Sequence, residues 1–205
     1  MFFDSDFMKL YSQLSTLNED ASLDLIEGKK DKNKSGKDKS HGNRPDYNSQ
    51  MDSFLRSLGF VKISELIPGC PSASSSGTNI WVPTEKAVGM SYRKDIPYFD
   101  HLTKRLENFV KELPDSDYPV RKWDSKPIQN NGDRKIYETD LGSQGGTQWR
   151  GLWFRTKIQD TKYFIFGKIF YKDYKKVNAS TNRDVATANK FYDIIIPEAE
   201  KINNK

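Results

Sequence analysis

The sequence predicts an α+β fold, in which a small, mostly antiparallel sheet is packed by helices. Three runs with the residue preferences of strands follow one another between residues 135 and 170, separated by short polar turns. Apolar residues recur at every third or fourth position over 99–113 and again over 183–196, which is the period of an amphipathic helix. We therefore place an α+β domain at 80–205.

The residues before this domain are predicted to form an extension in three parts. An amphipathic helix is expected at 1–27, because apolar residues there repeat at helical spacing. A flexible basic linker is expected at 28–48, since 28–44 has no aliphatic or aromatic side chain to offset the entropy of ordering. A helical segment followed by a Ser-rich loop completes the extension at 49–79. The apolar face of the first helix comprises Phe7, Leu10, Tyr11, Leu14 and Leu17.

The predicted domain begins with a short strand and a helix. The strand covers 80–83 and ends at Pro83, whose backbone cannot donate to a neighbouring strand. Pro97 suits the first turn of the helix, and Pro114 ends it. We expect this helix to bury its apolar face against the sheet.

The second part of the domain is predicted to be an antiparallel meander closed by a helix. Runs at 135–141, 148–158 and 162–170 are joined by a turn with three glycines and by a second turn, Gln159-Asp160-Thr161. The closing helix, 183–196, is expected to stop before Pro197.

Composition excludes several classes of function. Cys70 is the only cysteine among 205 residues, so neither an intrachain disulfide nor a thiolate metal site is expected. No apolar run approaches the roughly 20 residues of a membrane helix, and the acidic amino terminus is unlike a signal peptide. We therefore expect a cytoplasmic protein that uses no membrane, metal or cofactor.

The usual enzyme signatures are also missing. The sequence has no phosphate-binding loop followed by Lys-Ser or Lys-Thr, no metal-binding histidine pair and no nucleophile elbow. Cys70 with His101 as its base would be a conceivable nucleophile, but nothing in their spacing links them. The formal charge of +5 is compatible with a polyanionic partner.

Cleavage of RNA by its own 2′-hydroxyl needs only basic and phenolic side chains, which hold the phosphate, neutralise the developing charge and transfer protons. The meander and the segment after it supply these side chains. The alternative interpretation of the same residues is a solvated sheet face that ends in a lysine-rich loop. The residues are Arg150, Arg155, Lys157, Lys168, Tyr171, Lys172, Tyr174, Lys175 and Lys176.

The order of short motifs resembles the RelE/ParE toxin superfamily, within it the HigB-like, phage-derived branch. The motifs are "IYETDL", "WRGLWF" and "YFIFGKIFYKDYKK", preceded by a helix and followed by a closing helix near "RDVATA". The resemblance covers roughly residues 98–196. It implies a RelE-like fold and a toxin of a toxin–antitoxin system that cleaves messenger RNA on the ribosome, with a cognate antitoxin protein as its second partner.

By this resemblance, Arg150 would contact the scissile phosphate, while Tyr171, Lys172, Tyr174 and Lys175 would hold the acid and base. Arg155, Lys157, Lys168 and Lys176 would extend one RNA-binding face. The chain departs from the pattern at Asp140, where an arginine is usual, and by the absence of a histidine at the end of the last strand. The activity of the chain is therefore left open.

Two further alternatives stay open at this point. The same fold could act as a binding protein without catalysis, as in the related branch that poisons DNA gyrase. Trp149 or Tyr171 could stack on RNA bases, whereas packing within the sheet is the more common role of such aromatic residues.

Overall fold

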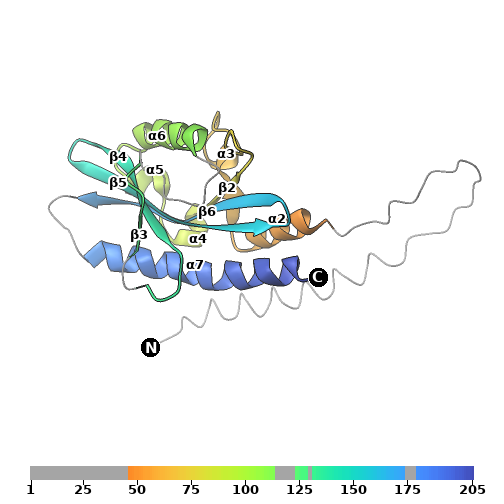
Figure 1. The fold of residues 1–205 in the computed structure, drawn as a ribbon. Helices are drawn as coiled ribbons and strands as arrows, with labels where there is room; N and C mark the ends of the chain where they lie inside the picture. Colours follow the sequence, from red (N-terminus) through yellow and green to blue (C-terminus); the bar gives the residue numbers. More distant parts are fainter. Residues whose placement is uncertain (1–45, 114–122, 129–130, 174–178) are drawn as a thin grey trace, which may run out of the picture. The chain divides into compact units, whose positions relative to one another are not determined.

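Six strands form one mixed sheet in the order β1-β2-β6-β5-β4-β3 in the computed structural model of the chain, which describes residues 46–113, 123–128, 131–173 and 179–205 (Figure 1). The predicted helix at 1–27 and nearly all of the linker at 28–48 lie outside the described residues. Neighbouring strands are antiparallel except β2 and β6, which are parallel. The strands are β1 (Phe60–Lys62), β2 (Asn79–Pro83), β3 (Lys126–Pro127), β4 (Tyr137–Gln144), β5 (Thr147–Ile158) and β6 (Thr161–Asp173).

The α+β class and the meander predicted from the sequence are confirmed. β4, β5 and β6 are consecutive antiparallel neighbours, and the two predicted turns join them. Gly145 and Gly146 take positive φ angles of 57° and 84° in the first turn, a conformation that glycine adopts without a steric penalty. The predicted strand at 80–83 and the helix at 99–113 are also present.

Helices cover both faces of the sheet. On one face lie α2 (Tyr47–Ser57) and α7 (Ala179–Asn203), and on the other lies α6 (Phe99–Glu112), as Figure 1 shows. Strand residues alternate between the two cores: Phe154 and Ile165 pack toward α7, whereas Trp153 and Phe164 pack toward α6. The described residues also include three short helices, namely α3 (Ile63–Leu66), α4 (Glu85–Val88) and α5 (Tyr92–Asp95).

The segment 49–79, predicted as a separate part of the extension, belongs to the same unit as the sheet. Asp46–Lys205 form one compact unit. Met51 and Leu55 of α2 are fully buried in the core shared with α7, and β1 pairs with β2. A strand of three residues is too short to show a two-residue period, so the sequence pattern does not reveal it.

The closing helix does not stop before Pro197, in contrast to the prediction. α7 continues to Asn203 with Pro197 inside it. Proline removes one helical hydrogen bond, yet Ala199 and Ile202 beyond it are buried in the core. Burial of these side chains offsets the cost of the proline.

A glycine fixes how closely α7 approaches the sheet. The register of β5 and β6 shifts between Leu152 and Trp153, which leaves Gly167 as the extra residue on β6. A Cβ atom on Gly167 would lie 3.0 Å from the Cα and Cβ atoms of Ala188 in α7. Because Gly167 has no Cβ atom, the backbone of α7 can pack directly on β6. Within the described ranges, no helix is long and apolar enough to cross a membrane.

Candidate active site

Charged side chains gather at one end of the sheet, on the face that α7 covers. Glu138 and Asp140 of β4 are cross-strand partners of Leu152 and Arg150 of β5, so the four side chains lie on one face. Lys172 of β6 extends this row, because it pairs with Gln148 of β5. We call Glu138, Asp140, Arg150 and Lys172 the Arg150 cluster.

The Arg150 cluster is held by close ion pairs. Arg150 Nη1 lies 2.9 Å from Asp140 Oδ2, and Arg150 Nε lies 3.6 Å from Glu138 Oε1. Lys172 Nζ donates to both oxygens of Glu138, at 3.0 and 3.2 Å. Glu138 is 4% exposed and Arg150 9% exposed, so these charges are almost entirely removed from water. The buried Arg150 Nε has no hydrogen-bond acceptor among the described residues.

A second buried pair of charges lies beside the cluster. Lys168 of β6 and Asp184 of α7 are 6% and 8% exposed, and Lys168 Nζ donates to the Val88 carbonyl at 3.3 Å. Burial raises the pKa of Asp184 to about 6, although Lys168, Arg183 and Lys172 oppose this shift. Burial also lowers the pKa of Lys168. Such opposed shifts in a confined group of charges are frequent at functional sites.

The raised pKa of Asp184 predicts how stability depends on pH. The folded chain keeps a proton on Asp184 between its usual pKa of 3.8 and about 6, whereas the unfolded chain loses it. Stability from this group is therefore present at low pH and falls as the pH rises through 4 to 6. The free energy of unfolding of Asp184→Asn, taken relative to that of wild type, should therefore rise by about 2–3 kcal/mol between pH 4 and pH 7. Urea unfolding of both proteins across this pH range is the measurement, and parallel profiles would contradict it.

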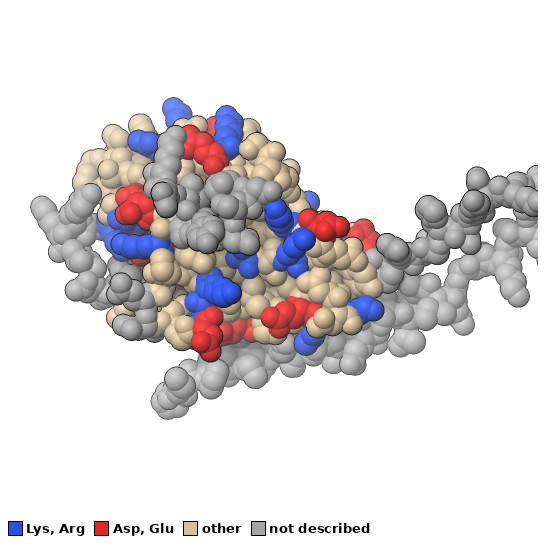
Figure 2. Space-filling view, viewed as in Figure 1, with Lys and Arg blue, Asp and Glu red and all other residues tan. Residues whose placement is uncertain are grey.

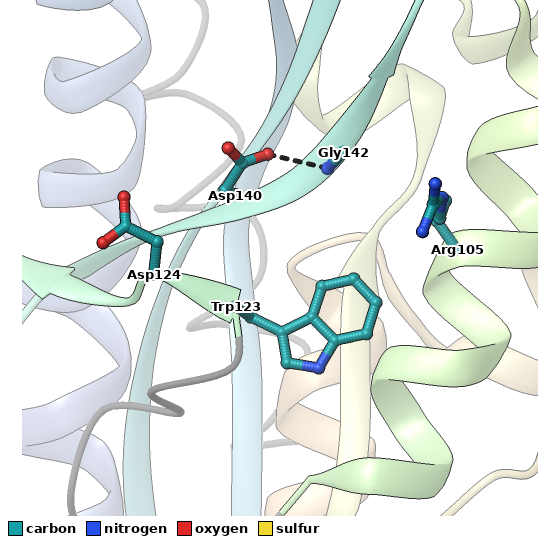
Figure 3. A pocket seen from close by; sticks show the side chains of 5 residues that line it. All are labelled: Arg105, Trp123, Asp124, Asp140 and Gly142. Carbon is teal, nitrogen blue, oxygen red and sulfur yellow. Dashed lines mark hydrogen bonds between the residues drawn. The ribbon is translucent and has the colours of Figure 1, made fainter.

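A pocket of about 250 Å³ opens beside the cluster at the β4 edge. Asp140 joins the two features, because its Oδ1 accepts from the Gly142 backbone at 2.7 Å while its Oδ2 faces Arg150. Figure 3 shows Arg105 of α6 across Trp123 from Asp140 and Asp124. Arg105 is exposed, and among the residues that the structure describes it has no hydrogen-bond or ion-pair partner. Among the described residues that line the pocket, Arg105 is thus an unpaired cation near the carboxylates of Asp124 and Asp140.

The structure brings together only part of the predicted site. Arg150, Lys168 and Lys172 lie on the α7 face, but all three are largely covered. Arg155 lies on the opposite face, with its guanidinium carbon 5.3 Å from the Trp153 ring centre. Lys157 is at the far end of the β5–β6 hairpin, where it pairs with Asp160 at 3.5 Å. Tyr174, Lys175 and Lys176 lie outside the described residues.

These positions do not form the single basic face that the sequence predicts. A strand places successive side chains on opposite faces, so Arg155 and Lys157 are separated from Arg150 by the sheet itself. On the face that Figure 2 shows, Lys and Arg side chains are interspersed with Asp and Glu side chains. A phosphate group on this face would therefore meet individual cations and not a continuous basic surface.

Sequence reasoning missed three members of this region: Glu138, Asp184 and Arg105. Glu138 and Asp140 are two apart in a predicted strand, and this spacing was the signal that both face one side. Asp184 and Arg105 come from helices far away in the sequence, so no local pattern marks them. Cys70 is 5% exposed and burial raises its pKa to about 11, which disfavours the thiolate that a nucleophile requires.

No family model, curated protein or solved structure matches the chain. Within the described ranges, no three His, Cys, Asp or Glu side chains are placed to hold a metal ion.

Proposed function

We propose that the chain is an endoribonuclease toxin of the RelE/ParE superfamily, HigB-like branch, which cleaves messenger RNA without a metal ion. The observation that supports this most is the Arg150 cluster beside the pocket, in which an arginine, a lysine and two carboxylates meet. The predicted succession of helix, three-stranded meander and closing helix supports it as well.

The cluster holds the groups that this reaction needs. A carboxylate such as Glu138 would take the proton of the 2′-hydroxyl as its oxygen bonds to phosphorus. Arg150 would neutralise the charge on the phosphorane, and Lys172 would give a proton to the departing 5′-oxygen as the phosphorus–oxygen bond breaks. The products would be a 2′,3′-cyclic phosphate and a 5′-hydroxyl end.

The Arg150 side chain must become reachable for this chemistry. In the free chain only 9% of Arg150 is exposed, and the pocket touches the cluster through Asp140 alone. We propose that the ribosome positions the message and that a cognate antitoxin blocks this site. Catalytic groups are often misaligned in the free enzyme and align when substrate is bound.

Cleavage of a labelled RNA by the purified full chain tests this proposal. With ribosomes and message present, we expect strand breaks that leave 2′,3′-cyclic phosphate ends and that disappear when the message carries 2′-deoxynucleotides. Lys172→Ala should lower the rate by about 10²-fold or more, as expected for loss of an acid catalyst. Lys201→Ala, a change near the end of α7 beside the β5–β6 turn, should leave the rate unchanged.

Growth of cells that express the chain provides the matching test in vivo. Wild type should slow growth and translation, and Lys172→Ala combined with Tyr174→Phe should relieve both effects. Equal growth of the two strains, at equal protein levels, would remove the case for catalysis.

A second candidate is a binding protein without catalysis, for example an inhibitor of gyrase. The pairing of Arg150 and Lys172 with carboxylates favours it, because a cluster of paired charges can serve structure alone. Inhibition of supercoiling in vitro with intact messenger RNA would support this candidate over RNA cleavage.

A further inference from the structure

Two tyrosine side chains stay exposed at the end of the sheet that carries the Arg150 cluster. Tyr98, just before α6, is 49% exposed, and Tyr171 of β6 is 37% exposed. Within the described ranges they are the exposed large hydrophobic side chains. Tyr171 is the cross-strand partner of Trp149, and Trp149 Nε1 donates to the Pro97 carbonyl at 3.0 Å. This hydrogen bond holds Pro97, the residue before Tyr98, beside β5, the strand that pairs with Tyr171 of β6.

The backbone keeps Tyr98 at the surface at a cost in energy. Tyr98 has φ 55° and ψ 40°, the left-handed conformation, which disfavours a residue with a Cβ atom by about 1–2 kcal/mol. Its ring lies on the β4–β5 turn at Gly145, where an added Cβ would collide with the phenol oxygen and lie 2.8 Å from Cζ. Gly145 thus leaves room for the ring, and nearly half of the side chain still faces solvent.

A pocket of about 460 Å³ lies next to Tyr98 and is lined by cationic side chains as well as aromatic rings. The His101 ring meets the Tyr98 ring edge-on at 6.4 Å, and the Arg93 guanidinium carbon lies 5.9 Å from the Phe99 ring centre. Arg93 and Lys94 are both exposed. The pocket is lined by Arg93, Lys94, Ile96, Pro97, Tyr98, Phe99, Asp100 and His101.

We propose that Tyr98 and Tyr171 are a stacking site for the unpaired bases of single-stranded RNA, with Arg93 and Lys94 contacting the adjoining phosphates. Aromatic faces bind bases of any sequence, and only an unpaired strand can present a free base to them. The inference rests on the proposed function for the choice of RNA as ligand. It adds a place where the substrate is held, on the sheet face opposite to the Arg150 cluster.

Trp149, the other aromatic residue considered from the sequence, does not contribute a stacking surface. It is 1% exposed and its indole nitrogen is engaged by Pro97. Its role is to hold the segment before Tyr98 in place. Of the two residues that the sequence offered for stacking, the structure leaves Tyr171 accessible and adds Tyr98, which no strand pattern marked.

Fluorescence anisotropy of the full chain with a short labelled RNA tests this site. The RNA carries 2′-O-methyl groups so that it cannot be cleaved by its own hydroxyl. Tyr98→Ala and Tyr171→Ala should each weaken binding by about 5- to 100-fold. Tyr98→Phe keeps the ring and should bind within about twofold of wild type, because the stacking face is unchanged. An RNA duplex of the same sequence should bind more weakly than the single strand.

Variants that fold but lack the ring separate stacking from structural damage. Asparagine tolerates the left-handed conformation, so Tyr98→Asn should keep the wild-type circular dichroism spectrum and lose affinity as Tyr98→Ala does. Arg93→Ala should lower the slope of log affinity against log salt by about 0.7. Lys201→Ala changes an exposed lysine near the end of α7, beside the β5–β6 turn, and should leave both affinity and slope unchanged.

The outcomes distinguish this site from the proposed catalysis. Wild-type affinity in folded Tyr98→Asn and Tyr171→Ala, or no RNA binding by wild type, would overturn the stacking site even if RNA were cleaved. Loss of affinity in these variants without any cleavage by wild type would leave the stacking site standing and reject the catalytic role. Tighter binding of single-stranded DNA than of RNA would reject RNA as the ligand.

Discussion

Replacing Arg150 by methionine should lower the free energy of unfolding by about 3–5 kcal/mol. Of the cations that the structure describes, only Lys172 would remain as a counter-ion to Glu138, which is 4% exposed, and Asp140 would lose the guanidinium that lies 2.9 Å away. Methionine fills similar space, so the expected loss comes from carboxylates left without a cation. Chemical denaturation at pH 7 measures the change, and RNA cleavage should be lost together with it.

Two comparisons isolate the charge effect. Lys157→Met removes an exposed cation from the same strand and should cost about 0.5 kcal/mol or less. Adding Glu138→Gln to Arg150→Met should restore part of the lost stability, because a neutral amide needs no counter-ion. Additive losses in the double variant would show that Glu138 and Arg150 do not interact energetically.

Replacing Phe109 by alanine should cost about 3–5 kcal/mol of stability. Phe109 of α6 is fully buried, and its ring centre lies 5.5 Å from Trp123, 5.6 Å from Phe164 and 5.7 Å from Phe166. The truncated side chain would leave a cavity between α6, the sheet and the segment that carries Trp123. Trp123, which lines the pocket beside Asp140, should then lose the ring against which it packs.

Asn108 provides a matched control on the same helix. Its side chain is exposed and alanine is a better helix former, so Asn108→Ala should change stability by no more than about 0.7 kcal/mol, in the stabilising direction. A similar midpoint of urea unfolding for Phe109→Ala and Asn108→Ala would show that α6 does not anchor this face of the sheet.

Residues close together in the sequence determined which elements form. The alternation of side chains and the glycine-rich turn predict the meander correctly, because strand pleat and turn geometry depend on immediate neighbours. The helical period over 99–113 predicts α6 for the same reason. These elements account for the α+β class.

Contacts between distant segments decided the rest. The parallel pairing of β2 with β6, the strand β1 and the continuation of α7 past Pro197 depend on burial that no local pattern records. The same holds for the site. The register of β4 against β5 decides whether Arg150 faces solvent or two carboxylates. The close approach of α7 to Gly167 decides which side chains surround Asp184. Sequence supplies the charged residues, and tertiary packing determines which of them meet and which remain accessible to a ligand.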